Sequence, residues 1–382
     1  MFAARLLPVA KIDPADWERC LPGEAEGHAY YSACETLPPI GFTLSAVAAF
    51  GADGRVVALC PVFRLDYNLA TAVQGAARRV ADFIGRNFPR LLRLSVIGLG
   101  SPLGERCHIG FIVGLSGTQK ILALQALLTA LTDYATAHRI GMVAVKDLAE
   151  PDEIILAASL KQAGYTHVNS LPVAVLDLNE GGEEGYFARL SPSLRRDLKR
   201  KLKKAGGVRI EQRPFSAELM ATIEHLYKST RASSTLDYGE FEELPPGYFA
   251  RVMQALGPRA FLYLYWVGDE LAAFNLMFRD DQRLIDKFWG MKREIARQHD
   301  LYFISWMHNV RFCLREGIPL LQTGQTAYAL KLRLGSRLVP GHVWFRHRNF
   351  MVDRMLRVLA RFIAYDAMDP DLKTRAKKET MT

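Results

Sequence analysis

Apolar residues are concentrated in two pairs of short segments, and each pair is joined by a turn that contains glycine and aspartate. The first pair is Phe42–Phe50 and Arg55–Leu65, and the second is Ala260–Val267 and Leu271–Arg279. Runs rich in β-branched and aromatic residues on both sides of such a turn predict β-hairpins. A further run, Leu284–Trp289, predicts a strand after the second hairpin.

Apolar residues recur at helical spacing in two longer segments, Thr118–His138 and Leu301–Glu316. A glycine ends each predicted helix, and a short apolar run that predicts a strand comes next, at Met142–Leu148 and at Ile318–Gln322. The order hairpin, helix, glycine, strand therefore occurs twice. We interpret it as a structural repeat of a mixed β/α unit, without clear residue identity between the copies. The predicted fold class is α/β (α+β).

The repeat divides the chain into two predicted domains, residues 1–180 and residues 181–382. The second begins with a basic helix at Leu190–Gly207, in which leucines recur every fourth residue. Ser191 is placed to cap this helix, and Pro192 suits its first position. The rest of its surface carries Arg195, Arg196, Lys199, Arg200, Lys201, Lys203 and Lys204 against Asp197. This surface is either a solvated face of a linker helix or a binding face for phosphate groups.

The formal net charge of +9 favours anionic partners, and 382 residues are enough for two domains with separate cores. The five cysteines are scattered and form no CxxC pair, so neither a disulfide framework nor a metal site is expected. The first residues lack the pattern of a signal peptide, and no uncharged apolar run reaches the length of a membrane span. We expect a cytoplasmic protein, able to act peripherally on the cytoplasmic face of a membrane.

Two further segments combine an apolar face with arginines. One is an insertion at about residues 67–97, whose amphipathic part is Thr71–Leu94, and the other is Arg348–Tyr365. Basic amphipathic helices are typical of elements that lie on a membrane surface, although a helix packed on the core with its arginines outward has the same pattern. Because two such segments occur, an anionic membrane surface is a candidate partner.

Features of the second half follow one another in the order of a known family. The basic helix comes first, the hairpin sequence GDELAAFNLMF follows, and the closing segment Gly324–Gly335 places a tyrosine and a lysine between two glycines. This order resembles the FemAB-like branch of the GNAT acyltransferase superfamily. The first half resembles the N-terminal half of tandem GNAT-like proteins at Trp17, Gly41, Phe42 and Leu59–Phe63. The resemblance implies two GNAT-like mixed-sheet domains in tandem.

Members of this superfamily move an acyl group from a thioester such as acyl-CoA, or from an aminoacyl-tRNA, to an amine. The reaction needs a base for the amine, hydrogen-bond donors for the oxyanion and a proton for the leaving group. The resemblance therefore implies acyl-CoA as a co-substrate, with aminoacyl-tRNA as the alternative donor, and no bound cofactor.

Two departures from the family pattern concern the donor and the base. Ordinary GNAT enzymes hold the CoA pyrophosphate on backbone N–H groups of a glycine-rich turn at the start of a helix. The corresponding loop, Met291–His299, has no glycine and offers the side chains of Lys292, Arg293 and Arg297 instead. The last predicted strand continues into Thr323, where the family often has an aspartate.

The candidates for acid–base chemistry are Asp286, His308 and Tyr328. Asp286 lies in an otherwise apolar strand, where it either acts as the base or pairs with an arginine. His308 lies in the middle of a predicted helix, and a packed or exposed histidine is the alternative there. Tyr328 lies in the closing segment and is placed to protonate the leaving group.

The candidates for binding are four residues. Lys331, also in the closing segment, is placed to hold a phosphate or a carboxylate. Asn275 interrupts an apolar strand and either presents its amide to the substrate or bonds within the core. Asp237 and Tyr238 begin an acidic, aromatic loop that is either a site for a cationic amine or an exposed loop.

The leading hypothesis is an N-acyltransferase that moves a long acyl chain from acyl-CoA to a lipid amine, such as a sphingoid base, in a ceramide-synthase-like reaction. The first alternative is FemAB-type transfer from aminoacyl-tRNA to a peptidoglycan-precursor or metabolite amine. The second is a non-catalytic RNA- or membrane-binding protein on the same fold. Steep salt dependence of RNA binding would distinguish a tRNA user.

Overall fold

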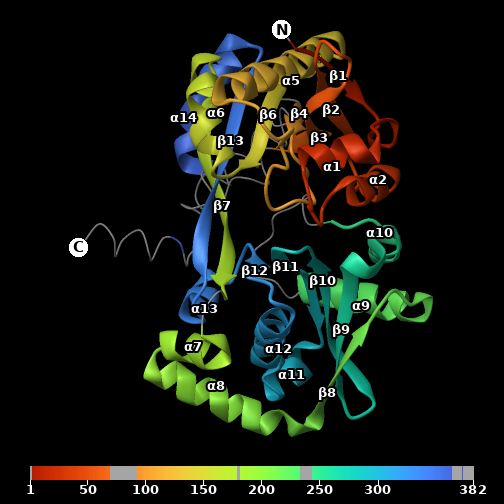
Figure 1. Ribbon diagram of the computed structural model, residues 1–382, viewed down its shortest axis with the longest axis vertical. Helices are drawn as coiled ribbons and strands as arrows, with labels where there is room; N and C mark the ends of the chain where they lie inside the picture. Colours follow the sequence, from red (N-terminus) through yellow and green to blue (C-terminus); the bar gives the residue numbers. More distant parts are fainter. Residues whose placement is uncertain (1, 69–92, 179–180, 233–242, 364–371, 373–382) are drawn as a thin grey trace, which may run out of the picture. The chain divides into compact units, whose positions relative to one another are not determined.

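The computed structural model describes residues 2–68, 93–178, 181–232, 243–363 and 372 (Figure 1). Contacts divide the chain into two compact units. Unit 1 comprises residues 1–172, 238–245 and 339–382, and unit 2 comprises residues 173–237 and 246–338. Each unit has a sheet with helices packed on it, which confirms the predicted mixed α/β class.

Unit 1 is built on the strand order β1-β2-β3-β4-β6-β13, with β5 beside β3. Its strands are β1 (Ala3–Leu7), β2 (Phe42–Phe50), β3 (Val56–Asn68), β4 (Arg93–Leu99), β5 (Gly110–Phe111), β6 (Met142–Leu148) and most of β13 (Arg337–His347). Its helices are α1 (Pro14–Cys20), α2 (His28–Thr36), α5 (Gly117–Ala137), α6 (Asp152–Gln162) and α14 (Phe350–Ile363). The N-terminus of α5 is fixed by a reciprocal pair of hydrogen bonds between Ser116 and Gln119.

Unit 2 is built on the strand order β12-β11-β10-β9-β8, and β7 (Thr166–Asp177) adds its second half beside β12. The strands are β8 (Val208–Arg213), β9 (Ala260–Val267), β10 (Glu270–Arg279), β11 (Arg283–Met291) and β12 (Leu320–Gly324). The helices are α7 (Gly182–Arg189), α8 (Pro192–Lys204), α9 (Met220–Ala232), α10 (Tyr248–Leu256), α11 (Arg293–Gln298), α12 (Leu301–Glu316) and α13 (Tyr328–Arg333).

The two units repeat one pattern of pairing. In unit 1, β2, β3 and β4 pair antiparallel in turn, and β4 then pairs parallel with β6 after the crossover through α5. In unit 2, β9, β10 and β11 pair antiparallel in turn, and β11 then pairs parallel with β12 after the crossover through α12. Both predicted hairpins and both predicted long helices therefore occur, and they occupy matching positions in the two sheets.

Each sheet is completed by a strand from beyond the domain boundary predicted at residue 180. The end of β7 pairs antiparallel with β12 in unit 2, and β13 pairs antiparallel with β6 in unit 1. The described residues from 339 onward, which include most of β13 and α14, are consequently grouped with unit 1. The local sequence of β7 carries no information about which strands it pairs with.

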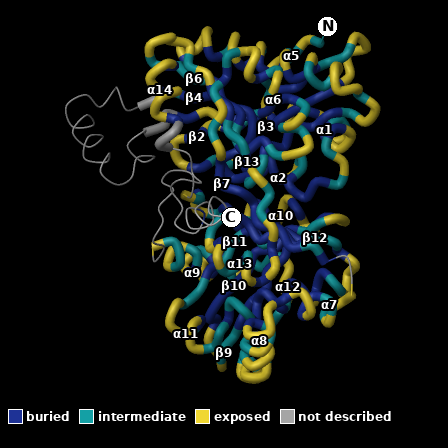
Figure 2. The backbone as a smooth tube through the Cα atoms, turned by 90° about the vertical axis from the view of Figure 1, so that its left-hand side faces the viewer, coloured by how far each residue is buried: buried dark blue, intermediate teal, exposed yellow. Residues whose placement is uncertain are grey.

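The basic helix of the sequence is α8, and it forms as predicted. Ser191 Oγ accepts a hydrogen bond from the backbone N–H of Leu194 at 3.4 Å, and Pro192 occupies the first turn. Leu194 and Leu198 are buried in the core of unit 2, whereas most of the cations of α8 are exposed. Figure 2 shows this exposed outer side of the helix.

Two sequence predictions of local structure are wrong. Residues 291–299 contain the short helix α11 instead of a loop, because they lack glycine and proline and place Glu294 in the first turn and Arg297 in the last. At the ends of the predicted insertion, residues 67–68 and 93–97 lie in β3 and β4. The predicted amphipathic segment 71–94 otherwise lies outside the described residues. Among the helices of the described segments, none has both the length and the apolar character needed to cross a membrane.

Candidate active site

The parallel strands of unit 2 separate part-way along their length. β11 pairs with β12 only through residues 283–285, opposite residues 320–322. Beyond that point β11 continues to Met291, still paired with β10 on its other edge. The first residue of β11 past the paired stretch is Asp286. The backbone of β11 from Asp286 onward is therefore not paired with β12, so its polar groups can meet a ligand.

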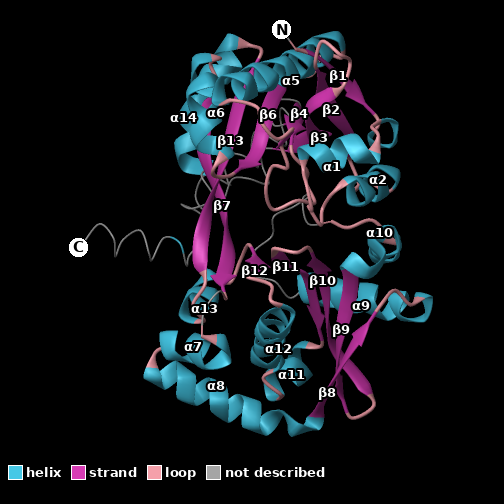
Figure 3. Ribbon diagram, viewed as in Figure 1, coloured by secondary structure: helices cyan, strands magenta, loops and turns pink. Residues whose placement is uncertain are grey.

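A β-bulge lies at the same place. Opposite the neighbouring residues Leu276 and Met277 of β10 stand Phe288 and Asp286, so Lys287 is the extra residue on β11. In a regular strand, residues 286 and 288 would point to the same face. Here Phe288 packs against aromatic rings of α9 and α10, whereas Asp286 points to Asn309 of α12. Figure 3 shows these helices on unit 2. The bulge therefore turns the carboxylate toward α12.

Five polar side chains meet under α12, and we call them the Asp286 cluster: Tyr265, Asn275, Asp286, Ser305 and Asn309. Asn309 Nδ2 donates to Asp286 Oδ2 at 3.5 Å, and the Tyr265 hydroxyl donates to Ser305 Oγ at 2.9 Å. All except Asp286, which is half-buried, are buried. The cluster is thus a buried network that reaches partly exposed surface at one carboxylate.

The amide of Asn275 satisfies both of its ends when its nitrogen faces Asp286. The nitrogen then donates to Asp286 Oδ1 at 2.6 Å and to the Phe288 carbonyl at 3.2 Å. The oxygen accepts from Ser305 Oγ at 3.2 Å and from Asn309 Nδ2 at 3.3 Å. In this orientation Asp286 accepts hydrogen bonds from two amides. Of the sequence candidates, Asp286 and Asn275 are therefore brought together.

Comparison with known proteins identifies the domain that holds this cluster. Residues 192–332 match the family model of the GNAT acetyltransferase domain. The chain carries a GNAT domain. The expectation of a GNAT-type acyltransferase enzyme is thereby confirmed. No curated protein sequence matches the chain.

Solved structures share the fold of the whole chain. The structure of FemX superposes with a TM-score of 0.59 and 12% sequence identity, and the match covers 93% of this chain and 99% of the FemX chain. A tandem GNAT protein from the clavulanic acid biosynthesis pathway gives a TM-score of 0.52 and 14% identity, over 91% and 99%. The C-terminal domain of a protein described as a lysylphosphatidylglycerol synthetase, from Agrobacterium fabrum, gives 0.52 and 12%, over 92% and 98%. The predicted FemAB-like, tandem GNAT fold is confirmed.

Two tyrosines of the GNAT domain are held in their protonated form near Asp286. Burial raises the pKa of the Tyr302 phenol well above its usual range, and the charge of Asp286 raises it further. The same two causes raise the pKa of Tyr265. The hydroxyl of Tyr265 already donates its hydrogen bond to Ser305. Tyr302 is half-buried and neutral, so it is available as a proton donor.

His308 lies beside the Asp286 cluster rather than in it. Its ring packs edge-on against Tyr263 of β9, with centroids 4.4 Å apart. Burial, followed by the charges of Arg315 and Arg311, lowers the pKa of His308 to about 4. The imidazole is therefore uncharged at neutral pH. Its catalytic role remains a prediction from the sequence.

Tyr328 and Lys331 are both buried in α13 of the GNAT domain. The Lys331 ammonium donates to the carbonyl of Thr323 at the end of β12. Just before α13, Thr326 and Ala327 have φ angles of 99° and 51°, a region that non-glycine residues rarely occupy. Such strain is often found next to functional sites. The predicted roles of Tyr328 and Lys331 remain untested.

We expect Lys331→Met to lower the free energy of unfolding by about 1–3 kcal/mol, because the buried Thr323 carbonyl loses the donor from Lys331. Urea denaturation followed by circular dichroism measures this change. Lys203→Met on the exposed side of α8 is the matched control, with an expected change below about 0.5 kcal/mol. Equal stability of both variants would show that the Lys331 hydrogen bond contributes nothing.

The predicted donor-binding cations take up different positions. Lys292 forms an ion pair with Glu270, whereas Arg293 and Arg297 are exposed on α11. Between α11 and α12, Asp300 forms an ion pair with Lys201 of α8, with Lys201 Nζ 3.3 Å from Asp300 Oδ1. The C-terminal end of α8 therefore lies close to α11, and the two helices together present positive charge.

The sequence did not single out Tyr302, Ser305 and Asn309. They lie three and four residues apart on α12, a spacing that puts polar groups on one face of a helix. The sequence shows this spacing, but the spacing indicates a functional site only when β11 is known to place Asp286 opposite this face of α12. Asp237 and Tyr238, the predicted amine-binding residues, lie outside the described residues.

Proposed function

We propose that the protein is an N-acyltransferase that moves a long acyl chain from acyl-CoA to the amine of a membrane lipid, with a sphingoid base as the first acceptor to test. The observation that carries the proposal is the carboxylate of Asp286, which accepts hydrogen bonds from two amides at the point where β11 leaves β12. A carboxylate there can take a proton from an amine that approaches the stretch of β11 that is not paired with β12.

The steps follow from the groups around that opening. Asp286 accepts the proton that the attacking amine loses as its nitrogen bonds to the thioester carbon. The oxyanion of the tetrahedral intermediate meets backbone N–H groups of β11. When the carbon–sulfur bond breaks, the neutral phenol of Tyr302 protonates the thiolate. The proton on Asp286 then passes to solvent and the Tyr302 phenolate takes one from solvent, which returns both groups to their starting state.

The cations support a donor that carries phosphates. Arg293 and Arg297 of α11 are exposed, and Lys203 and Lys204 lie on the exposed surface of the neighbouring end of α8. Side-chain cations of this kind can substitute for a glycine-rich backbone cradle.

The surface of α14 in unit 1 supports the proposal that the acceptor is a membrane lipid. This helix exposes Phe350, Met351, Met355, Val358 and Leu359 on one side. Exposed fractions reach 74% for Phe350 and 79% for Met351, and the arginines Arg348 and Arg354 are exposed beside them. An apolar stripe bordered by arginines fits an anionic lipid surface.

A mass-spectrometric assay tests the proposed reaction. Acyl-CoAs of several chain lengths, and charged tRNA, are offered against sphingoid, amino-acid and muropeptide amines. The expected product is an N-acylated sphingoid base formed from a long-chain acyl-CoA. Acylation of a soluble amine alone would overturn the lipid acceptor, and the absence of product with every pair would overturn the enzyme assignment.

Vesicle binding should depend on α14. We expect the protein to sediment with vesicles that contain phosphatidylglycerol. Met351→Ser and Val358→Ser should each weaken binding about 10- to 100-fold, because a buried apolar side chain is worth about 1.5–3 kcal/mol. Val113→Ser, at an exposed apolar residue outside α14, is the control. Equal binding of all variants would exclude α14 as the contact.

Aminoacyl-tRNA is the second candidate donor. It is favoured by the absence of glycine in residues 291–299 and by Asp300, whose carboxylate stands at the start of α12, where a pyrophosphate would otherwise bind. Binding of tRNA that weakens steeply between 50 and 200 mM salt (values typical of such titrations) and aminoacyl transfer in the assay above would support it.

A further inference from the structure

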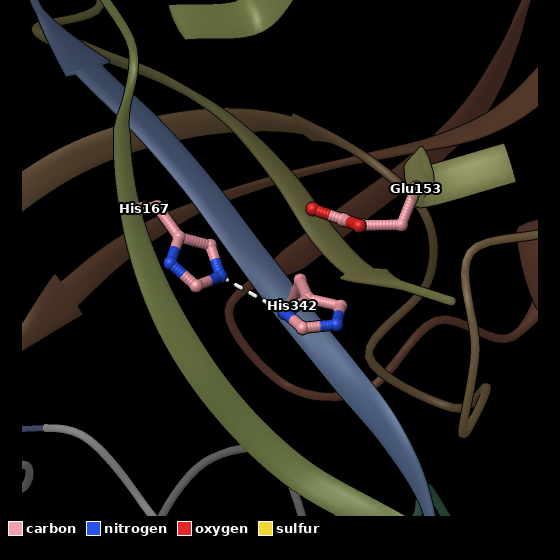
Figure 4. Close-up of side chains that lie close together, drawn as sticks. All are labelled: Glu153, His167 and His342. Carbon is pink, nitrogen blue, oxygen red and sulfur yellow. Dashed lines mark hydrogen bonds between the residues drawn. The ribbon is translucent and has the colours of Figure 1, made fainter. Parts of the chain in front are cut away.

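Three side chains with metal-binding atoms converge in unit 1. His167 lies on β7, His342 on the neighbouring β13, and Glu153 in the first turn of α6. His167 Nε2 and His342 Nδ1 are 2.9 Å apart, and one carboxylate oxygen of Glu153 and one nitrogen of each ring lie within 4.8 Å of one another. Figure 4 shows the carboxylate directed toward the two imidazoles.

We propose that His167, His342 and Glu153 bind a first-row divalent cation, with Zn²⁺ as the probe. Two imidazoles and one carboxylate are a ligand set that zinc uses, with bonds of about 2.0–2.2 Å. Two ligand atoms at that distance from one ion are separated by roughly 2.9–3.4 Å when the bond angle lies between about 90° and 109°. The imidazole nitrogens therefore already have the spacing that a shared ion requires.

The charge and position of the three residues favour a cation over a simple hydrogen bond. A hydrogen bond between two neutral imidazoles needs no carboxylate, whereas Glu153 adds a negative charge beside both rings. All three side chains are at least partly exposed, so an ion can reach them. The remaining coordination positions of the ion would hold water.

A second cluster in unit 1 shows the contrast. Glu24, Glu26 and His108 also lie within range of one another, but all three are buried. Arg106 forms an ion pair with Glu24 and donates to His108 Nε2 at 3.2 Å. A guanidinium therefore already supplies the positive charge there, and we assign no metal to that cluster.

The ion would add a direct link between the first turn of α6 and the neighbouring strands β7 and β13. Its proposed role is structural, and it is independent of the acyl transfer proposed for unit 2. Binding should consequently raise the melting temperature of the protein.

Titration of the untagged, chelator-treated full chain with Zn²⁺ tests the site by calorimetry and elemental analysis. We expect one equivalent to bind with a micromolar or lower dissociation constant. His167→Ala combined with His342→Ala should abolish this binding, a weakening of at least about 100-fold, and Glu153→Gln should weaken it about tenfold. His138→Ala, at an exposed histidine on the end of α5, should bind like the wild type.

The melting temperature gives a second measurement, in case a variant folds poorly. Zn²⁺ should raise it in the wild type and in His138→Ala, and much less in Glu153→Gln, which keeps the shape of the side chain. No binding at 100 µM Zn²⁺ (about a hundred times a micromolar dissociation constant), or one equivalent retained in the double histidine variant, would overturn the proposal.

Discussion

Asp286→Asn is expected to lower kcat by about 10²–10⁴-fold, the range that removal of a general base produces. Asparagine has the shape of aspartate but cannot take a proton from the amine. The substitution also replaces one carboxylate oxygen by an NH₂ group, so one of the two hydrogen bonds that Asp286 accepts from Asn275 and Asn309 is lost. The variant should remain folded by circular dichroism, and the acidic limb of its pH–rate profile should disappear.

The matched control is Asp269→Asn, in the exposed turn between β9 and β10. It removes the same charge from unit 2, at a residue that has no place in the Asp286 cluster. Its rate should stay close to that of the wild type. If Asp286→Asn also kept its rate within threefold (a difference of less than about 1 kcal/mol), the assignment of the base would be wrong.

Gly290→Ala should destabilise unit 2 by about 1–3 kcal/mol or more, as expected for overpacking. A Cβ at Gly290 of β11 would lie 2.2 Å from Cε1 of Phe274 and 2.9 Å from the backbone nitrogen of Tyr227 in α9. The ring of Phe274 is fully buried and the α9 backbone is fixed by its helix, so neither can yield cheaply. A melting temperature lower by several degrees would record the effect.

Gly206→Ala provides the comparison for that change. A Cβ there meets no heavy atom within 4 Å, and Gly206 does not have a positive φ. Its melting temperature should therefore equal or slightly exceed that of the wild type. Two glycine variants with the same melting temperature would mean that α9 moves away from β11 without cost.

The sequence predicted those features that depend on neighbouring residues. The hairpins, α5, α8 and α12 have caps, turns and apolar spacing within their own segments. Asp286 and Asn275 stood out because polar residues are rare in buried strands. The bulge at Lys287 and the partners Ser305 and Asn309 depend on how β10, β11 and α12 pack, which no single segment encodes. Nor does any single segment encode the pairing of β7 with β12, the pairing of β13 with β6, or the contact between His167 and His342.

The pairing of β13 with β6 delays completion of the first sheet during synthesis. β6 ends at Leu148, but its partner β13 is finished only at His347, roughly 200 residues later. At translation rates of about 5–20 residues per second, one edge of the first sheet waits roughly 10–40 s for its last strand. During that interval β6 offers open backbone groups that other chains could pair with. Nascent chains should therefore depend on chaperones until residues 337–347 have left the ribosome.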